Sequence, residues 1–177
     1  MTTITKSPEL NVRTRHGRAV NAVAELLRSS LSVPNVYLEP HNLGASKIDV
    51  LAVDRAGAGD LHGVEIKIPG PSVPPLGPRT QRLQMLRDLA QLQAYPTHYK
   101  YLALPKTDSL VRLLPELRLF SPDGIGRTGI LLLSEQTDGL PLVEIAIKPE
   151  RYRVSPPDME KIDRFLARNR PDIEVRI

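Results

Sequence analysis

Hydrophobic and polar residues follow one another along this chain in patterns that predict both helices and strands. Over Arg13–Leu31, apolar residues recur every three or four positions, which is typical of an amphipathic helix. A second helix is predicted over Arg79–Tyr95, where a polar stripe runs along a helix that is apolar over most of its girth. We expect this second helix to be largely buried, with the stripe facing a cleft or a polar network. The stripe consists of Gln81, Gln84, Asp88, Gln91 and Tyr95.

Short runs rich in Val, Ile and Leu predict the strands of a central sheet. Ile48–Val53 and Val64–Ile68 flank a polar, glycine-bearing connection, Asp54–Gly63, and this arrangement is typical of a β-hairpin. The other predicted elements are strands over 33–39, 99–104, 129–134, 142–148 and 173–177, and helices over 109–114 and 156–168. A helix between two strands indicates a crossover onto the same sheet, and we expect the strand over 142–148 to lie at an edge. The expected fold class is therefore α/β, with a central mixed β-sheet flanked by helices.

Each strand of the predicted hairpin carries an acid among apolar neighbours. Asp49 lies between Ile48 and Val50 in the first strand, and Glu65 lies in the second, where it shares a face with Lys67 because residues two apart on a strand point the same way. Charged side chains are rarely buried unless they are paired or bound to a metal. Two acids that meet beside one lysine could hold Mg²⁺, which takes oxygen ligands. The alternative is an exposed hairpin with a cross-strand ion pair, worth roughly 0.2–1 kcal/mol.

The spacing of these residues resembles the signature of the PD-(D/E)xK nuclease superfamily. Asp49 is followed, after fifteen residues, by Glu65-Ile66-Lys67, and Gln91 to Tyr95 is similar to the QxxxY helix motif of the RecB-type branch. His16 lies where that branch carries a metal-binding histidine on its first helix. The ordered set spans residues 16–95, and Lys47-Ile48 stands where the pattern begins with a proline. The small bacterial MmcB-like DNA-repair proteins are similar in layout and size.

This resemblance implies a restriction-endonuclease-like core and a Mg²⁺- or Mn²⁺-dependent deoxyribonuclease that hydrolyses phosphodiester bonds in repair, restriction or defence against mobile elements. The metal ligands that it implies are Asp49, Glu65, the Ile66 carbonyl and His16. Lys67 would position water and stabilise the charge that develops on the phosphate. Gln91 and Tyr95 would orient the substrate or Lys67.

The first predicted helix leaves the function open. Many relatives carry a catalytic glutamate on it, but Glu25 lies roughly 160° from the centre of the apolar stripe at about 100° per residue. Asn21 lies at the edge of that stripe, and His16 lies on it, either as a ligand or as a half-packed residue at the start of the helix. The alternative functions are a non-catalytic nucleic-acid-binding or assembly module and a nuclease that is active only with a partner. Glu39 and His41, just before the hairpin, could also face the site.

Composition narrows the class of protein only a little. The 177 residues, 41% of them hydrophobic, are enough for one domain, expected over residues 12–177 after a flexible N-terminus over 1–11. The net charge of +4 is compatible with a polyanionic partner such as nucleic acid, and the resemblance favours DNA. A homodimer or a partner protein is also compatible with the sequence. The chain contains no Cys, which excludes disulfides, zinc–thiolate sites and the Fe–S cluster of some RecB-type nucleases.

Two further segments bear on partners and location. No apolar run approaches the roughly 20 residues of a membrane span, and the N-terminus lacks the apolar stretch of a signal peptide, so we expect a cytoplasmic protein with no membrane association. The segment Pro69–Pro78 is rich in Pro and Gly, so it is either a stiff wall of the site or a simple connection. Residues 150–177 are basic and could contact phosphates. Their cations include Arg151, Arg153, Lys161, Arg164, Arg168 and Arg170.

Overall fold

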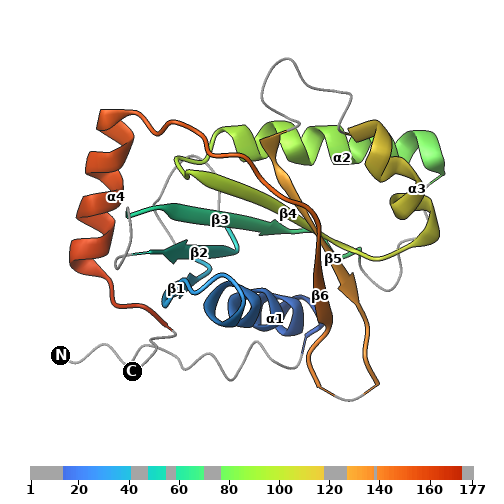
Figure 1. The fold of residues 1–177 in the computed structure, drawn as a ribbon, viewed down its shortest axis with the longest axis horizontal. Helices are drawn as coiled ribbons and strands as arrows, with labels where there is room; N and C mark the ends of the chain where they lie inside the picture. The colour runs from blue at the N-terminus through green and yellow to red at the C-terminus, as the bar shows by residue number, and fades with distance from the viewer. Residues whose placement is uncertain are drawn as a thin grey trace.

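Six strands and four helices make up the part of the chain that the computed structural model describes (Figure 1). The described residues are 14–40, 48–54, 59–69, 77–117, 127–137 and 139–172. The helices are α1 (Arg15–Ser29), α2 (Pro78–Gln93), α3 (Asp108–Leu117) and α4 (Pro156–Arg168). The strands are β1 (Asn35–Leu38), β2 (Val50–Val53), β3 (Leu61–Ile66), β4 (Tyr99–Pro105), β5 (Gly129–Ser134) and β6 (Leu142–Ile147). The strand predicted over 173–177, the N-terminus over 1–11, His41 and most of the Pro-rich segment lie outside the described residues.

All six strands belong to one mixed sheet, in the order β1-β2-β3-β4-β5-β6. The first three strands are antiparallel to one another, β3, β4 and β5 run parallel, and β6 is antiparallel to β5. The parallel pairs are joined through α2 and α3, as parallel strands require a crossover. The prediction of an α/β fold with a mixed sheet flanked by helices is confirmed, and so is the position of β6 at an edge.

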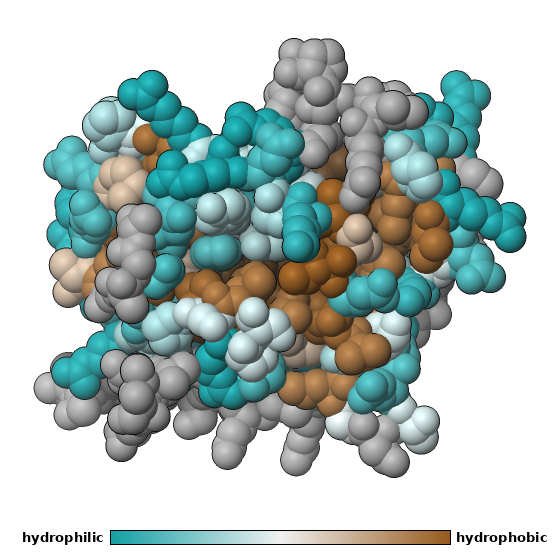
Figure 2. Space-filling view, in the orientation of Figure 1, coloured by the Kyte–Doolittle hydropathy of each residue, from teal (hydrophilic) through white to brown (hydrophobic). Residues whose placement is uncertain are grey.

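The two faces of the sheet are covered by different helices. On one face α1 packs its apolar stripe, including Val20, Val23 and Leu27, against β1, β2 and β3. On the other face lie α2, α3 and α4, which bury Leu89, Leu110 and Ile162 against the sheet (Figure 1). Figure 2 shows hydrophobic residues gathered across the middle of one side of the molecule, with hydrophilic residues around them. Among the described helices, none has both the length and the apolar character needed to cross a membrane.

The expectation that α2 is largely buried is wrong. Its buried side includes Met85 and Leu89, whereas Leu83 is 51% exposed and Ala90 is also exposed to solvent. The physical reason is that a single layer of helices covers this face of the sheet, so the side of α2 that points away from the sheet meets water. Apolar residues on that side made the helix look buried in the sequence.

The predicted hairpin is present, but its second strand begins three residues earlier than expected, at Leu61 instead of Val64. The difference arises because Gly63 is a strand residue and not part of the turn. A Cβ atom at Gly63 would lie 2.5 Å from Cδ1 of Ile48, so glycine is required there for close packing. Among the described residues of the connection, Gly59 has a φ of +72°, a backbone conformation that favours glycine.

Candidate active site at the end of strand β3

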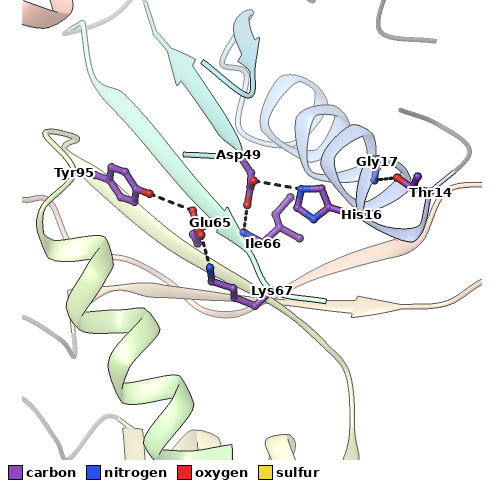
Figure 3. A network of polar contacts seen from close by, with 8 residues as sticks. All are labelled: Thr14, His16, Gly17, Asp49, Glu65, Ile66, Lys67 and Tyr95. Carbon is purple, nitrogen blue, oxygen red and sulfur yellow. Dashed lines mark hydrogen bonds and ion pairs between the residues drawn. The ribbon is translucent and has the colours of Figure 1, made fainter. Parts of the chain in front are cut away.

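Asp49 lies just before β2 and is held by the backbone of β3. Its Oδ2 atom accepts a hydrogen bond of 2.6 Å from the amide of Ile66, and its own amide donates to the carbonyl of Val64 over 3.2 Å. The side chain of Asp49 therefore takes the place of a backbone partner at the point where the β2–β3 ladder ends. The carboxylate of Asp49 is thus fixed by β3, the strand that carries the candidate residues Glu65 and Ile66 (Figure 3).

His16 connects this carboxylate to α1. Thr14 caps the helix by accepting a hydrogen bond of 2.9 Å from the amide of Gly17, which places His16 in the first turn. The His16 Nε2 atom lies 3.3 Å from Oδ1 of Asp49. The hydrogen bond to Asp49 raises the pKa of His16 against the opposing effect of burial, and the charges of Asp49, Glu39 and Glu65 add to this rise. His16 is therefore an ion-pair partner of Asp49 when it is protonated, and it could ligate a metal only in its neutral form.

Glu65 is nearly buried on the face of the sheet that α2 covers. Its Oε1 atom lies 2.6 Å from Nζ of Lys67, and the hydroxyl of Tyr95 donates to its Oε2 atom over 3.4 Å. Burial raises the pKa of Glu65, and the neighbouring negative charge of Asp49 raises it further, while Lys67 and Tyr95 act in the opposite direction. Two carboxylates thus lie close enough to repel each other beside a single ammonium group (Figure 3).

Lys67 remains a cation in this environment. Burial lowers its pKa, but the hydrogen bond and charge of Glu65, together with the charges of Asp88 and Asp49, outweigh burial and raise it. Its side chain is 38% exposed, so the ammonium group can reach both the buried Glu65 and a molecule in solvent. Lys67 is therefore suited to donate hydrogen bonds to an anion and unsuited to accept a proton.

The polar stripe of α2 is only partly directed at this site. Tyr95, just beyond the end of the helix, is buried and contacts Glu65, whereas Gln91 is exposed and its side chain forms no hydrogen bond with any described residue. Asp88 is buried and accepts a hydrogen bond of 3.0 Å from Gln84. Asp88 belongs to the stripe that was expected to face a cleft or a polar network, and its spacing from Tyr95 was a usable signal for a position near the site.

Other positions on α1 and before the hairpin are oriented elsewhere or act indirectly. Glu25 is exposed and pairs with Arg28, so the sequence-based expectation that it points away from the stripe is confirmed. Asn21 donates to the carbonyl of Gly17 in its own helix, over 2.8 Å. Glu39 acts on the site through its charge, which raises the pKa of His16.

The chemistry of the donors fits a hard divalent cation, although no group of three or more His, Cys, Asp or Glu side chains in the described residues is placed to hold one. Asp49 and Glu65 offer carboxylate oxygens. The carbonyl of Ile66 faces the same side of β3 as its amide, which binds Asp49. A pair of repelling, partly buried carboxylates is an arrangement that a divalent cation would neutralise.

The basic residues of α4, and Arg151 before it, lie away from this site. α4 packs near Val53 and Leu61, which pair with each other at the opposite end of the hairpin from Asp49, and a hollow of about 590 Å³ lies there. Arg151 is paired with Asp60 at 2.9 Å. Within α4 itself three acids balance three bases, namely Asp158, Glu160 and Asp163 against Lys161, Arg164 and Arg168.

The fold and the site together define an α/β protein with a cluster of two acids, a lysine, a histidine and a tyrosine at the end of one central strand. No family model matches the chain, and no curated protein matches it. The structure is similar to a solved protein of unknown function from Silicibacter pomeroyi, with a TM-score of 0.52 and 14% sequence identity over 88% of this chain and 85% of that chain. This similarity extends to the fold alone.

Proposed function

We propose that this protein has a restriction-endonuclease-like core and is a Mg²⁺- or Mn²⁺-dependent nuclease of the PD-(D/E)xK type, related in pattern to the RecB-type and MmcB-like branch. The observation that supports the proposal is the meeting of two polar clusters at the end of β3. His16 pairs with Asp49, and Tyr95 and Lys67 contact Glu65; the clusters adjoin at Ile66, which follows Glu65 in β3 and donates its amide to Asp49. The proposed substrate is nucleic acid, with DNA favoured.

In this proposal Asp49, Glu65 and the carbonyl of Ile66 would hold the metal ion, with His16 as a further ligand once it is neutral. A divalent ion in such a site polarises a phosphate and lowers the pKa of bound water. Hydrolysis consumes one water and converts a phosphodiester into a phosphate monoester and a hydroxyl group.

The residues of the chain then have separate tasks. Lys67, kept protonated by its acidic neighbours, would donate hydrogen bonds to phosphate oxygens as negative charge develops on them. Tyr95 orients the Glu65 carboxylate by its hydrogen bond, and His16 orients that of Asp49. Gln91, which is exposed on α2, would contact the substrate.

The proposal is tested by cleavage of labelled single- and double-stranded DNA and RNA with Mg²⁺, with Mn²⁺ and with a chelator. Lys67→Ala should lower the rate by roughly 10²–10³, the typical cost of removing one electrostatic donor, while leaving nucleic-acid binding largely intact. Lys106→Ala is the matched control, because Lys106 is an exposed lysine whose partner is Glu144. Metal-independent cleavage, or equal rates for Lys67→Ala and wild type, would refute the proposal.

One observation favours the second candidate, a nucleic-acid-binding or assembly module that has kept the fold without turnover. Glu25, the acid on α1, faces away from the site, so this helix adds no carboxylate to it. Binding of nucleic acid without cleavage under any metal condition would support the module. Cleavage that appears only when a second protein is added would support a nuclease that depends on a partner.

A further inference from the structure

Asp88 is a buried carboxylate with a single neutral hydrogen-bond donor among the described residues. Only 5% of the residue is exposed, and the amide of Gln84 donates to its Oδ1 atom over 3.0 Å. A buried ion is costly unless a charge of opposite sign lies near it. Arg87, the cation next to Asp88 in the sequence of α2, is exposed, and Arg82 is engaged with Glu116 at 3.4 Å.

The topology brings Lys67 to Asp88. Because β3 and β4 are parallel and α2 connects them, α2 runs antiparallel to β3. Tyr95, at the C-terminal end of α2, contacts Glu65. A residue that precedes Tyr95 on α2 therefore lies beside residues that follow Glu65 along β3. At 1.5 Å per helical residue, Asp88 lies roughly 10 Å from Tyr95 along the axis of α2. At 3.3 Å per strand residue, Lys67 lies roughly 7 Å from Glu65 in the same direction.

The charges around Lys67 agree with this placement. Three carboxylates from three elements act on it: Glu65 on its own strand, Asp49 before β2 and Asp88 on α2. Glu65 and Asp49 belong to the candidate metal site, whereas Asp88 lies on the helix behind it. Asp88 is thus the acid near Lys67 that remains available when the other two are occupied.

We propose that Asp88 is a positioning residue that anchors the ammonium group of Lys67 at the candidate active site. This inference rests on the proposed function. In the structure Lys67 is paired with Glu65 at 2.6 Å, and a cation bound by Glu65 would compete with that pair. Asp88, held in turn by Gln84, keeps Lys67 in place for the substrate phosphate after Glu65 has turned to the metal.

The first experiment compares Asp88→Asn with wild type in a cleavage assay. The expected result is a fall in kcat of about tenfold, with unchanged KM and an unchanged Mg²⁺ concentration for half-maximal rate, because Asp88 touches neither substrate nor metal. In a Lys67→Met background the same substitution should have no further effect, since Asp88 acts through Lys67. Asp163→Asn, an exposed acid on α4, is the control and should leave kcat unchanged. A raised Mg²⁺ requirement, or equal effects in both backgrounds, would overturn the inference.

A second experiment needs no activity. Lys67→Met should lower the melting temperature, because it removes the cation that is paired with the buried Glu65 and whose charge also acts on the buried Asp88. Adding Asp88→Asn should restore the part of the loss that belongs to Asp88. Without this suppression the anchoring contact does not exist. If the wild-type protein cleaves no nucleic acid, the proposed function fails, and the melting temperatures alone decide whether Asp88 holds Lys67.

Discussion

Asp49 should be far more important for stability than an acid in a metal site usually is. Replacing it with Ala leaves the amide of Ile66, a residue that is 3% exposed, without its 2.6 Å partner. An unsatisfied buried amide costs about 1–3 kcal/mol, and loss of the partly exposed pair with His16 adds up to about 1 kcal/mol. We therefore expect Asp49→Ala to lower the free energy of unfolding by about 1–4 kcal/mol.

Urea unfolding in the presence of a chelator measures this effect without any contribution from metal binding. Asp49→Asn should lose only about 1 kcal/mol, because an amide oxygen can still accept from Ile66 while the charge is lost. Glu144→Ala, which removes an exposed ion pair with Lys106, is the control and should change stability by less than about 0.5 kcal/mol. If Asp49→Ala unfolds at the same urea concentration as wild type, the carboxylate does not hold the end of β3 and the reasoning is refuted.

Three further predictions concern acid stability, the tyrosine and the basic tail. Burial lowers the pKa of His62 to about 4, below the value of about 6.5 in the unfolded chain, so the free energy of unfolding should fall by about 3 kcal/mol as the pH drops from 6.5 to 4. His62→Phe should remove this part of the loss when urea unfolding is measured at each pH. Identical pH profiles for the variant and the wild type would contradict the prediction. Tyr95→Phe should keep the core packing but lower kcat by roughly tenfold through a less ordered Glu65, and a fall in stability of more than about 2 kcal/mol would instead show a structural role. Joint neutralisation of Arg153 and Arg168 should leave the salt dependence of nucleic-acid affinity nearly unchanged, since α4 lies at the far end of β3 and carries balanced charge. If the slope of log affinity against log salt concentration fell by about two, the binding surface would lie there instead.

The elements of this fold were largely predictable because most have a clear hydrophobic period. β5 and α4 begin and end where the pattern predicts, at Gly129–Ser134 and Pro156–Arg168. Ser155 and the prolines that follow it mark the start of α4 directly, as a capping serine and two residues suited to the first turn. The start of β3 was missed because Gly63, which resembles a turn residue in sequence, is required by packing against Ile48.

The candidate site was predictable to the extent that strand and helix spacing determine which side chains share a face. Spacing identified Glu65 and Lys67 as neighbours, the polar stripe indicated Tyr95, and the resemblance to the nuclease pattern indicated His16, which contacts Asp49. It could not decide which part of the α2 stripe meets the sheet, because that depends on how the helix is rotated about its axis. The rotation buries Asp88 and leaves Gln91 exposed, and nothing in the local sequence determines it.

The two acids of the site differ in how freely they can move, and this difference bears on what the site can do. Asp49 is tied to the backbone of β3 by a short hydrogen bond, so its position is determined by the fold. Glu65 is held by side chains alone, namely a flexible lysine and the distant hydroxyl of Tyr95, and both burial and Asp49 disfavour its charge. Removing that charge by Glu65→Gln should therefore stabilise the folded protein at neutral pH, an advantage that disappears as the pH falls below about 4.3, where Glu65 is protonated in the unfolded chain as well. One acid with a fixed position beside a second acid that can move, and whose charge is disfavoured, is an arrangement that can bind a cation and release it. A loss of stability in Glu65→Gln would show instead that the charge of Glu65 stabilises the fold.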